Sequence, residues 1–443
     1  MKDQCFWTRD WPAGGPLSGD GEAAERPEAA GAATTAAHAA EPLPADVDVA
    51  IIGAGFTGLS AARNLARGGA SVAVLEQHTF GWGASSRNGG MVSLGGKRGL
   101  KAWVEVYGRE RAHRLWQATV DAVDLVESIV AEEGIDCAWQ RSGTLECAWK
   151  PEHFGHIADY QRFLYEEVGR ETTLIAPKDM AQEIGTRRFY GALKSEGDGG
   201  LDPARFTAGL AHAAREAGAR IHEGTEVTAL SPSPKGHRLL TSRGRLEAAE
   251  VLVATNGYTG AATPELRRTV IPIGSHIIVT EPLGKDLADE LMPNRRMAWD
   301  TKTMLYYFRI TPDDRMLFGA RAAFRPVTTQ QSGAILQRHM VELFPQLIGK
   351  RVEYTWDGHV GFTFDYDPNV GRRDGVWYAL GYCGHGVALA TFMGDRMAAA
   401  IAGRPVDNPF FELRTPPTNP FYRSSAWFLP LGDIYYRLKD RLT

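Results

Sequence analysis

The sequence predicts a mixed α/β fold in which a Rossmann-like dinucleotide-binding domain is interleaved with a second domain, built on a large mixed or antiparallel sheet with helices. Three observations support this prediction. A strand, a glycine-rich turn, a helix and a second strand follow one another from residue 46, strand-like stretches recur between 220 and 324, and a second glycine-rich turn precedes a helix near residue 386. The chain has 443 residues, of which 44% are apolar. It is therefore long enough for about two or three domain-sized units.

The composition argues against several classes of function. The formal net charge is −4 and no long basic block occurs, so no nucleic-acid partner is expected. The four cysteines form no CxxC pair and the histidines show no metal spacing, so neither a metal site nor a redox dithiol is predicted. No apolar run is long enough to span a membrane, and acids and prolines stand where a signal peptide needs an apolar core. We therefore expect a cytoplasmic protein, and the sequence leaves its oligomeric state open.

Residues 1–45 are rich in Ala, Gly, Pro and Glu, and they predict a flexible leader that cannot bury enough apolar surface to become ordered. Phe6, Trp7 and Trp11 depart from this pattern. Two alternatives are open for them. These aromatic residues tether the start of the chain to the folded body, or they are stray residues in a disordered segment.

The strongest local signal is a glycine-rich turn inside a βαβ unit. The unit consists of a predicted strand at 47–52, a helix at 59–67 and a strand at 71–75. In the turn, Gly53 allows the sharp bend, Gly55 lets the backbone approach a pyrophosphate, and Gly58 lets helix and strand pack closely. Glu76 lies 18 residues after Gly58, where a carboxylate can bind both ribose hydroxyls and would repel a 2′-phosphate. The motif predicts a bound dinucleotide but does not specify which one.

The remaining elements follow from the spacing of apolar residues. Residues 101–135 predict amphipathic helices, because their apolar side chains recur at intervals of three and four. Asp202 and Pro203 mark the start of a helix that continues through 205–217. Further predicted elements are short strands in 220–255, strands at 276–280 and 304–310, a helix at 335–347, and a strand, turn and helix in 376–402.

Two more segments are rich in glycine. Residues 81–91 carry too many glycines for a buried helix, and residues 381–387 precede the C-terminal helix. Each is either an ordinary surface turn or a length of backbone wrapped around a ligand. The second interpretation predicts inward-pointing hydroxyl and N–H groups in the first segment. It predicts a helix N-terminus facing an electron-rich group in the second.

In combination these motifs resemble the D-amino-acid-oxidase-like FAD-dependent oxidoreductases, and within them most closely the γ-glutamylputrescine oxidase branch. The resemblance extends in consistent order from about residue 46 to 404. It rests on five stretches: the βαβ unit, 83–90, 251–258, 271–278 and 381–387.

The resemblance implies an FAD cofactor and three groups of residues that hold it. The ADP half would be held by Gly53, Gly55, Gly58, Glu76 and Gln77, with Val227 at the adenine and Ala254 at the ribose. The flavin and its phosphates would be lined by Ser85, Ser86, Asn88, Gly89, Gly90 and Met91. The pyrimidine edge of the ring would meet Gly384, His385, Gly386 and Val387.

The resemblance also implies a division of the chain into domains. The FAD-binding domain would comprise residues 46–100, 196–265 and 352–404, and the substrate domain residues 101–195 and 266–351. Residues 405–443 would form an amphipathic tail that packs on the body, with a membrane-surface helix as the alternative.

Departures from the family pattern affect the expected chemistry. Relatives with covalent flavin carry a cysteine just before the stretch corresponding to 362–367, and none stands there, so the FAD is expected to be non-covalent. Cys383 lies in the turn near the ring, where we interpret it as a small filler rather than a flavin link. Leu317 occupies the position of an oxygen-activating lysine. Val92 and Gly95 replace the arginines that grip small amino-acid carboxylates.

The implied reaction is oxidative deamination of a primary or secondary amine, such as a polyamine derivative or an N-substituted amino acid. Hydride would pass from the substrate to flavin N5, the imine would hydrolyse to an aldehyde or keto acid, and O2 would be reduced to hydrogen peroxide. Two alternatives are open: a dehydrogenase that passes electrons to a quinone or other acceptor, and a dinucleotide-binding protein without turnover.

Substrate contacts are expected from the sheet of the second domain. The candidates are Arg321, Trp356, His276, Tyr307 and Arg309. An arginine on an inward strand face would clamp a substrate carboxylate through two parallel hydrogen bonds, whereas elsewhere it would make a surface ion pair. Trp356 would form an aromatic wall beside the flavin.

Overall fold

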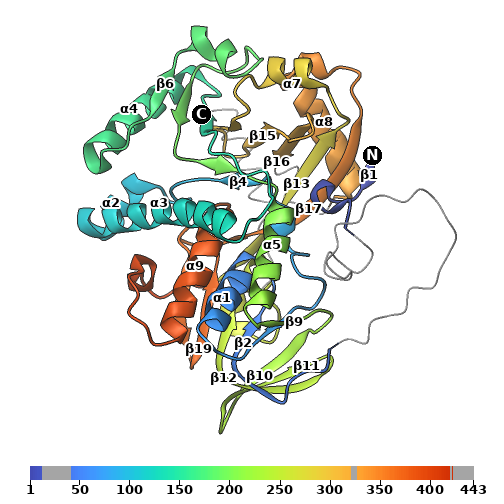
Figure 1. Ribbon diagram of the computed structural model, residues 1–443. Helices are drawn as coiled ribbons and strands as arrows, with labels where there is room; N and C mark the ends of the chain where they lie inside the picture. Colours follow the sequence, from blue (N-terminus) through green and yellow to red (C-terminus); the bar gives the residue numbers. More distant parts are fainter. Residues whose placement is uncertain (12–40, 321–326, 420–421, 423–443) are drawn as a thin grey trace, which may run out of the picture.

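Two large β-sheets organise the chain in a computed structural model that describes residues 1–11, 41–320, 327–419 and 422 (Figure 1). The sheet in the lower half of the figure has eight strands, and the sheet above it has nine. Chain segments pass back and forth between the two. The predicted mixed α/β fold with two interleaved sheet-based parts is therefore confirmed.

The eight-stranded sheet contains the predicted βαβ unit. Five strands run parallel in the order β19 (Val376–Leu380), β12 (Gly244–Val253), β2 (Asp46–Ile52), β3 (Val72–Leu75) and β9 (Arg220–His222). The helix α1 (Phe56–Arg67) connects β2 to β3. The apolar runs of β2 and β3 are buried, as expected for parallel strands covered on both faces. The other three strands are β10 (Val227–Ser233), β11 (Gly236–Thr241) and β18 (Asn369–Arg373), which pair antiparallel.

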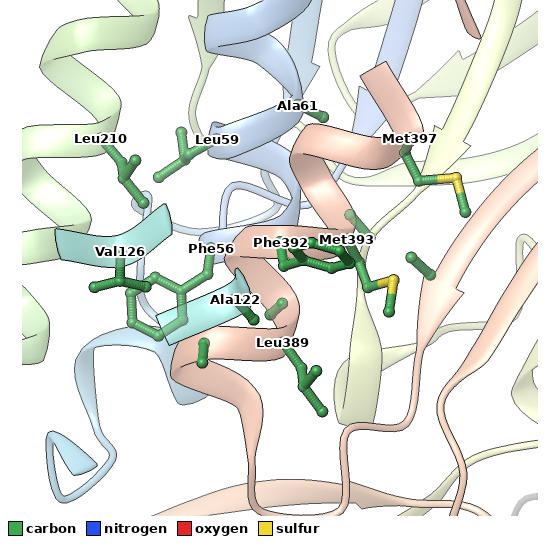
Figure 2. Packing of buried hydrophobic residues seen from close by; sticks show 14 of the residues in the cluster. Phe56, Leu59, Ala61, Ala122, Val126, Leu210, Leu389, Phe392, Met393 and Met397 are labelled. Carbon is green, nitrogen blue, oxygen red and sulfur yellow. The ribbon is translucent and has the colours of Figure 1, made fainter. Parts of the chain in front are cut away.

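Small residues allow the helices over this sheet to approach closely. A Cβ atom at Gly394 would come within 2.3 Å of the Thr57 carbonyl oxygen, so glycine sets the distance between α1 and the C-terminal helix. Helices α5 (Pro203–Glu216) and α9 (Gly386–Ile401) pack against α1, and α3 (Arg109–Glu132) packs against α9. Figure 2 shows their shared core, with Phe56, Leu59, Val126, Leu210, Leu389, Phe392 and Met393 among its side chains.

The nine-stranded sheet is covered by helices on one face. Its strand order is β1 (Lys2–Asp3), β17 (Val352–Phe362), β13 (Ile271–Thr280), β16 (Met316–Ala320), β15 (Tyr306–Ile310), β14 (Met297–Asp300), β5 (Thr144–Cys147), β7 (Ala192–Ser195) and β6 (Thr173–Ile175). Alternate residues such as Leu145, Phe308 and Phe318 pack with Leu336 and Met340 of α8 (Thr329–Leu343) and with α7 (Lys285–Leu291). The opposite face is left for the functional site.

The predicted domain boundaries need two corrections. Strand β17 pairs with β13 along its length, so it belongs to the larger sheet although residues 352–362 were assigned to the FAD-binding domain. Helices α2 (Leu100–Tyr107) and α3 pack into the core that contains α1 and α9, although 101–135 were assigned to the substrate domain. The apolar pattern of a strand does not predict which other strand it pairs with, because pairing depends on residues far away in the sequence.

The start of the chain is tethered to the body, which decides between the two alternatives left by the sequence. Phe6 and Trp7 are 1% and 4% exposed and pack with Tyr354 and Trp356 of β17. Strand β1 pairs with β17 in parallel. The aromatic residues bury enough apolar area to hold residues 1–11, so this part of the leader is not a free segment.

The described part of the C-terminal tail also packs on the body. Phe410 is buried in the core beside Trp103, and Tyr422 donates its hydroxyl to the Val270 carbonyl oxygen at 2.9 Å. Residues 423–443 lie outside the described residues. In the ranges that the structure describes, no helix combines the length and hydropathy needed to cross a membrane.

Candidate active site

A cavity of about 780 Å³ starts at the glycine-rich turn of the βαβ unit and continues along the free face of the larger sheet. Most of the predicted cofactor residues line it: Gly53, Gly55, Glu76, Gln77, Ser85, Asn88, Gly89, Met91, Val227, Ala254, Gly384, His385, Gly386 and Val387. Gly58, Ser86 and Gly90 lie behind this wall. The three glycine-rich segments, far apart in the sequence, thus meet around one space.

Each glycine of the βαβ turn is required by a close contact. Gly53 has φ +105°, a left-handed conformation that favours glycine, and its Cβ would lie 3.1 Å from the Ala254 carbonyl oxygen. A Cβ at Gly58 would lie 1.9 Å from the Gly53 carbonyl oxygen, so only glycine lets α1 start beside β2. Gly55 faces the cavity, and its Cβ would lie 2.8 Å from Ser85 Oγ.

Glu76 and Gln77 line the cavity at the end of β3. The carboxylate of Glu76 accepts hydrogen bonds from the Ala54 and His78 N–H groups, both at 3.0 Å. These bonds fix the side chain beside the glycine turn, at the position where a nucleotide ribose would be bound.

The segment 81–91 is folded inward and locked by its own side chains. The Asn88 amide donates to the carbonyl oxygens of Ala84 and Ser85 at 3.1 and 2.8 Å, and its Oδ1 accepts from the Gly90 N–H at 2.7 Å. Ser85 Oγ accepts from the Phe56 N–H at the start of α1. This segment is therefore a rigid wall of the cavity, not an ordinary surface turn.

The outward-facing carbonyl groups of the same segment are held by residues from elsewhere in the chain. Cys5 Sγ donates to the Ser86 carbonyl oxygen at 3.3 Å, Trp356 Nε1 to that of Arg87 at 2.8 Å, and Trp7 Nε1 to that of Asn88 at 2.9 Å. Three consecutive carbonyl groups are thus each given a donor. The sequence pattern does not indicate a role for Cys5 and Trp7 near the site, because these contacts join segments about eighty residues apart.

The turn 381–387 closes the cavity from the C-terminal side. His385 and Gly386 begin α9, so the N-terminus of this helix faces the cavity. Burial lowers the pKa of His385 to about 4, with Lys97 adding to the shift, so the ring is neutral at pH 7. Its Nδ1 atom has no hydrogen-bond partner among the described residues.

Comparison with known proteins now decides the family. The family described as FAD dependent oxidoreductase (DAO) matches residues 48–400. The chain belongs to this family.

The oxidoreductase also resembles individual proteins over most of its length. It is 31% identical over 401 residues to the gamma-glutamylputrescine oxidoreductase of Escherichia coli (strain K12), covering 89% of this chain and 93% of the relative. It is 33% identical over 406 residues to a probable oxidoreductase OrdL of Rhizobium meliloti (strain 1021), covering 89% and 92%. The crystal structure of glycine oxidase from Geobacillus kaustophilus matches with a TM-score of 0.70 at 23% identity, covering 84% of this chain and 99% of that one, a likeness of fold.

The cavity of this oxidoreductase fits the FAD on which its family depends. Gly55 leaves the backbone open where a pyrophosphate must approach, and the N-termini of α1 and α9 both face the space. The unpartnered Nδ1 of His385 is a polar atom that a bound group with a polar edge would satisfy. The protein is therefore an FAD-dependent oxidoreductase, as the resemblance implied.

Of the five predicted substrate residues, the structure places Tyr307 in the cavity lining. Its ring lies against Gly89 and over Gly319. Its hydroxyl shares a 3.0 Å hydrogen bond with Ser275 Oγ. Arg321 lies outside the described residues.

The other three candidates do not line the cavity, which corrects the prediction. His276 follows the cavity-lining Ser275 and precedes Ile277, so its side chain leaves β13 on the opposite face. Arg309 is on the correct face but is 4% exposed, and it donates to the carbonyl oxygens of Gly90 and Leu201 at 3.3 and 3.0 Å. Trp356 is covered by Phe6, Trp7 and the 86–88 backbone. Arg309 and Trp356 support the cavity wall.

A row of residues that the sequence pattern does not reveal crosses the larger sheet in register. From β13 to β7 the row contains Ile277, Gly319, Tyr307, Trp299, Glu146 and Leu193. Residues paired in this way point to one face, and all of them except Gly319 line the cavity. One local signal was present: Glu146 is a charged residue between Leu145 and Cys147 in a strand that is otherwise buried.

The FAD is expected to be released when the protein is denatured. Cys383 is 3% exposed, burial raises the pKa of its thiol to about 11, and its Sγ atom is engaged with Thr363 and with the Gly381 carbonyl oxygen. A protonated, hydrogen-bonded thiol is a poor nucleophile toward the flavin. Acid precipitation should give a colourless pellet and a yellow supernatant, whereas a yellow pellet would show a covalent link.

Proposed function

We propose that this oxidoreductase oxidises the carbon next to the nitrogen of an amine whose remote end is polar. The observation that carries the proposal is the continuous cavity, which extends from the FAD site onto a sheet face lined by Tyr307, Trp299 and Glu146. The similarity to a gamma-glutamylputrescine oxidoreductase supports an amine substrate of this kind.

In this proposal the glycine turn and Glu76 hold the ADP half of FAD. The 85–91 wall and the turn 384–387 hold the flavin, with the neutral His385 and the N-terminus of α9 at its edge. When bound, FAD accepts a hydride equivalent from the substrate carbon.

The residues of the chain orient the amine and exclude water. Tyr307 joins the 85–91 wall, here called the flavin wall, to the sheet, and its hydroxyl can accept a hydrogen bond from the neutral substrate nitrogen. Loss of hydride leaves an imine, which adds water and releases an aldehyde or keto acid together with the amine or ammonia. The electron pair and two protons convert O2 to hydrogen peroxide.

A second candidate differs in the electron acceptor. Leu317 is fully buried and faces Gly89, so no cation stands at the position where some relatives place an oxygen-activating lysine. This favours a dehydrogenase that passes its electrons to a quinone or another acceptor.

An anaerobic screen tests both candidates. Polyamines, N-acyl polyamines, N-methyl amino acids and D-amino acids are mixed with the holoenzyme, and loss of the visible flavin absorbance is followed. We expect bleaching by at least one long amine, followed in air by one peroxide per amine oxidised. Bleaching without peroxide supports the dehydrogenase, and flavin that no amine bleaches contradicts the proposed function.

A further inference from the structure

Glu146 lines the cavity two strands away from Tyr307, on the opposite side of Trp299. It lies in the middle of β5, in register with Trp299 on β14 and with Leu193 on β7. Its side chain is half-buried and lines the cavity. No other side chain of the described residues hydrogen-bonds its carboxylate. A carboxylate in such a position needs a positive partner or a proton.

The surroundings of Glu146 favour a cation. Trp299 is paired with Glu146 across β14 and β5, and burial followed by the nearby Glu146 carboxylate raises the pKa of Tyr160 of α4 (Pro151–Val168). Both aromatic residues line the cavity, as does Trp116 of α3, and aromatic rings attract ammonium groups. Burial raises the pKa of the Glu146 carboxyl and the nearby Lys97 lowers it. A second cation bound beside it would stabilise the charged form further. Lys97 itself is exposed at the cavity wall.

The separation between Tyr307 and Glu146 exceeds the length of a small amino acid. Tyr307 lies against Gly89 in the flavin wall, and Glu146 is two strands further across the sheet. Neighbouring strands are about 4.8 Å apart, so Glu146 lies about 10 Å beyond Tyr307, the reach of about three residues of extended chain. Glycine is too short to contact both. A polyamine or an amine joined to an amino acid is long enough.

We propose that Glu146 is the specificity residue of this cavity and binds an ammonium group at the remote end of the substrate, while the reacting amine lies near Tyr307 and the FAD. This inference rests on the proposed function. The ammonium belongs either to a polyamine or to the amino-acid part of an aminoacyl amine, and both place a cation at this distance.

Two matched substrate pairs distinguish these sources. γ-Glutamylputrescine is compared with glutarylputrescine, which lacks only the α-ammonium group, and spermidine is compared with N-acetylspermidine, in which one amine is neutral. Wild-type holoenzyme should prefer the ammonium-bearing member of one pair by about ten- to hundredfold in kcat/KM, the usual range for a hydrogen bond to a charged group.

The Glu146→Gln variant keeps the shape of the side chain and removes its charge. It should lose this preference through KM, with kcat and the rate for the neutral member nearly unchanged. Glu166→Gln, an exposed position on the same helix as Tyr160, is the matched control and should keep the preference. Equal losses for both members of a pair, together with a lowered Tm, would show that Glu146 only stabilises the fold and would overturn the proposal. Absence of any wild-type preference would overturn it as well.

Binding without turnover separates this proposal from the proposed function. γ-Glutamylbutylamide and glutarylbutylamide lack the terminal amine, and calorimetry gives their affinities for the holoenzyme. If Glu146→Gln abolishes a wild-type preference for the first while no amine bleaches the flavin, the ammonium site stands and the proposed function fails. If amines are oxidised without a preference that depends on Glu146, the proposed function stands and the ammonium site fails.

Discussion

The Gly55→Val variant is expected to fold but to contain no FAD and to show no measurable activity. A branched side chain at this position would project into the cavity, where the cofactor's pyrophosphate must approach the backbone. Its Cβ would also lie 2.8 Å from Ser85 Oγ and would push the hydroxyl away from the Phe56 N–H group. Both effects act on the site and not on the core. Flavin absorbance of the purified protein and circular dichroism measure the two consequences separately.

Two further variants make this result specific. Gly155→Val places the same side chain on α4, where a Cβ meets no atom within 4 Å, and should keep its full FAD content. Glu76→Ala removes the ribose acceptor and should weaken FAD binding by about 1.5–3 kcal/mol, or roughly ten- to hundredfold in Kd. If Gly55→Val purifies with one FAD per chain, the motif is only a structural turn and the assignment of the ADP half is wrong.

The glycine turn could be predicted from the sequence because its constraints are local. Gly53 and Gly58 are in contact with each other across five residues, and the strand and helix that flank them have clear apolar patterns. The second and third glycine-rich segments were also found, because glycine at such density has few structural uses. The FAD cofactor could be inferred only from the combination of these segments with the βαβ unit.

The substrate side could not be predicted in the same way, because it depends on strand register. Arg309 and Tyr307 share a face of β15, yet the 88–91 segment covers the first and leaves the second open. His276 points away from the cavity because successive residues of a strand face opposite sides of the sheet. Its neighbours Ser275 and Ile277 line the cavity instead. Glu146 enters the cavity only because β5 pairs with β14, and these strands are about 150 residues apart in the sequence. Such pairings are set by the whole fold.

The N-terminal segment shows the same dependence on distant contacts, and it supports a prediction of its own. Phe6 and Trp7 fill the space between β17 and the 85–91 wall of the cavity, and the Arg9 guanidinium lies 3.9 Å from the centre of the Phe6 ring. Trp7 gives the Asn88 carbonyl group its donor, while the Asn88 side chain orders the segment from the cavity side. The wall is therefore fixed from both sides.

The Trp7→Phe variant should weaken FAD binding by about tenfold or more, although Trp7 does not line the cavity. The substitution keeps an aromatic ring but leaves the half-buried Asn88 carbonyl oxygen without its donor, a loss of about 1–3 kcal/mol. Trp7→Ala also removes the ring that packs with Phe6 and Trp356 and should lower the free energy of unfolding by about 3–5 kcal/mol.

Trp377→Phe is the control, because it removes an indole donor to Glu250 on the smaller sheet, away from the cavity. Fluorescence titration of the apoprotein gives the Kd, and the visible spectrum reports the flavin environment. A lowered Tm with wild-type FAD affinity and spectrum in both Trp7 variants would show that residues 1–11 only tether the start of the chain to the body. Weaker FAD binding in Trp7→Phe at a nearly unchanged apoprotein Tm would instead show that the first residues of the chain position the flavin wall.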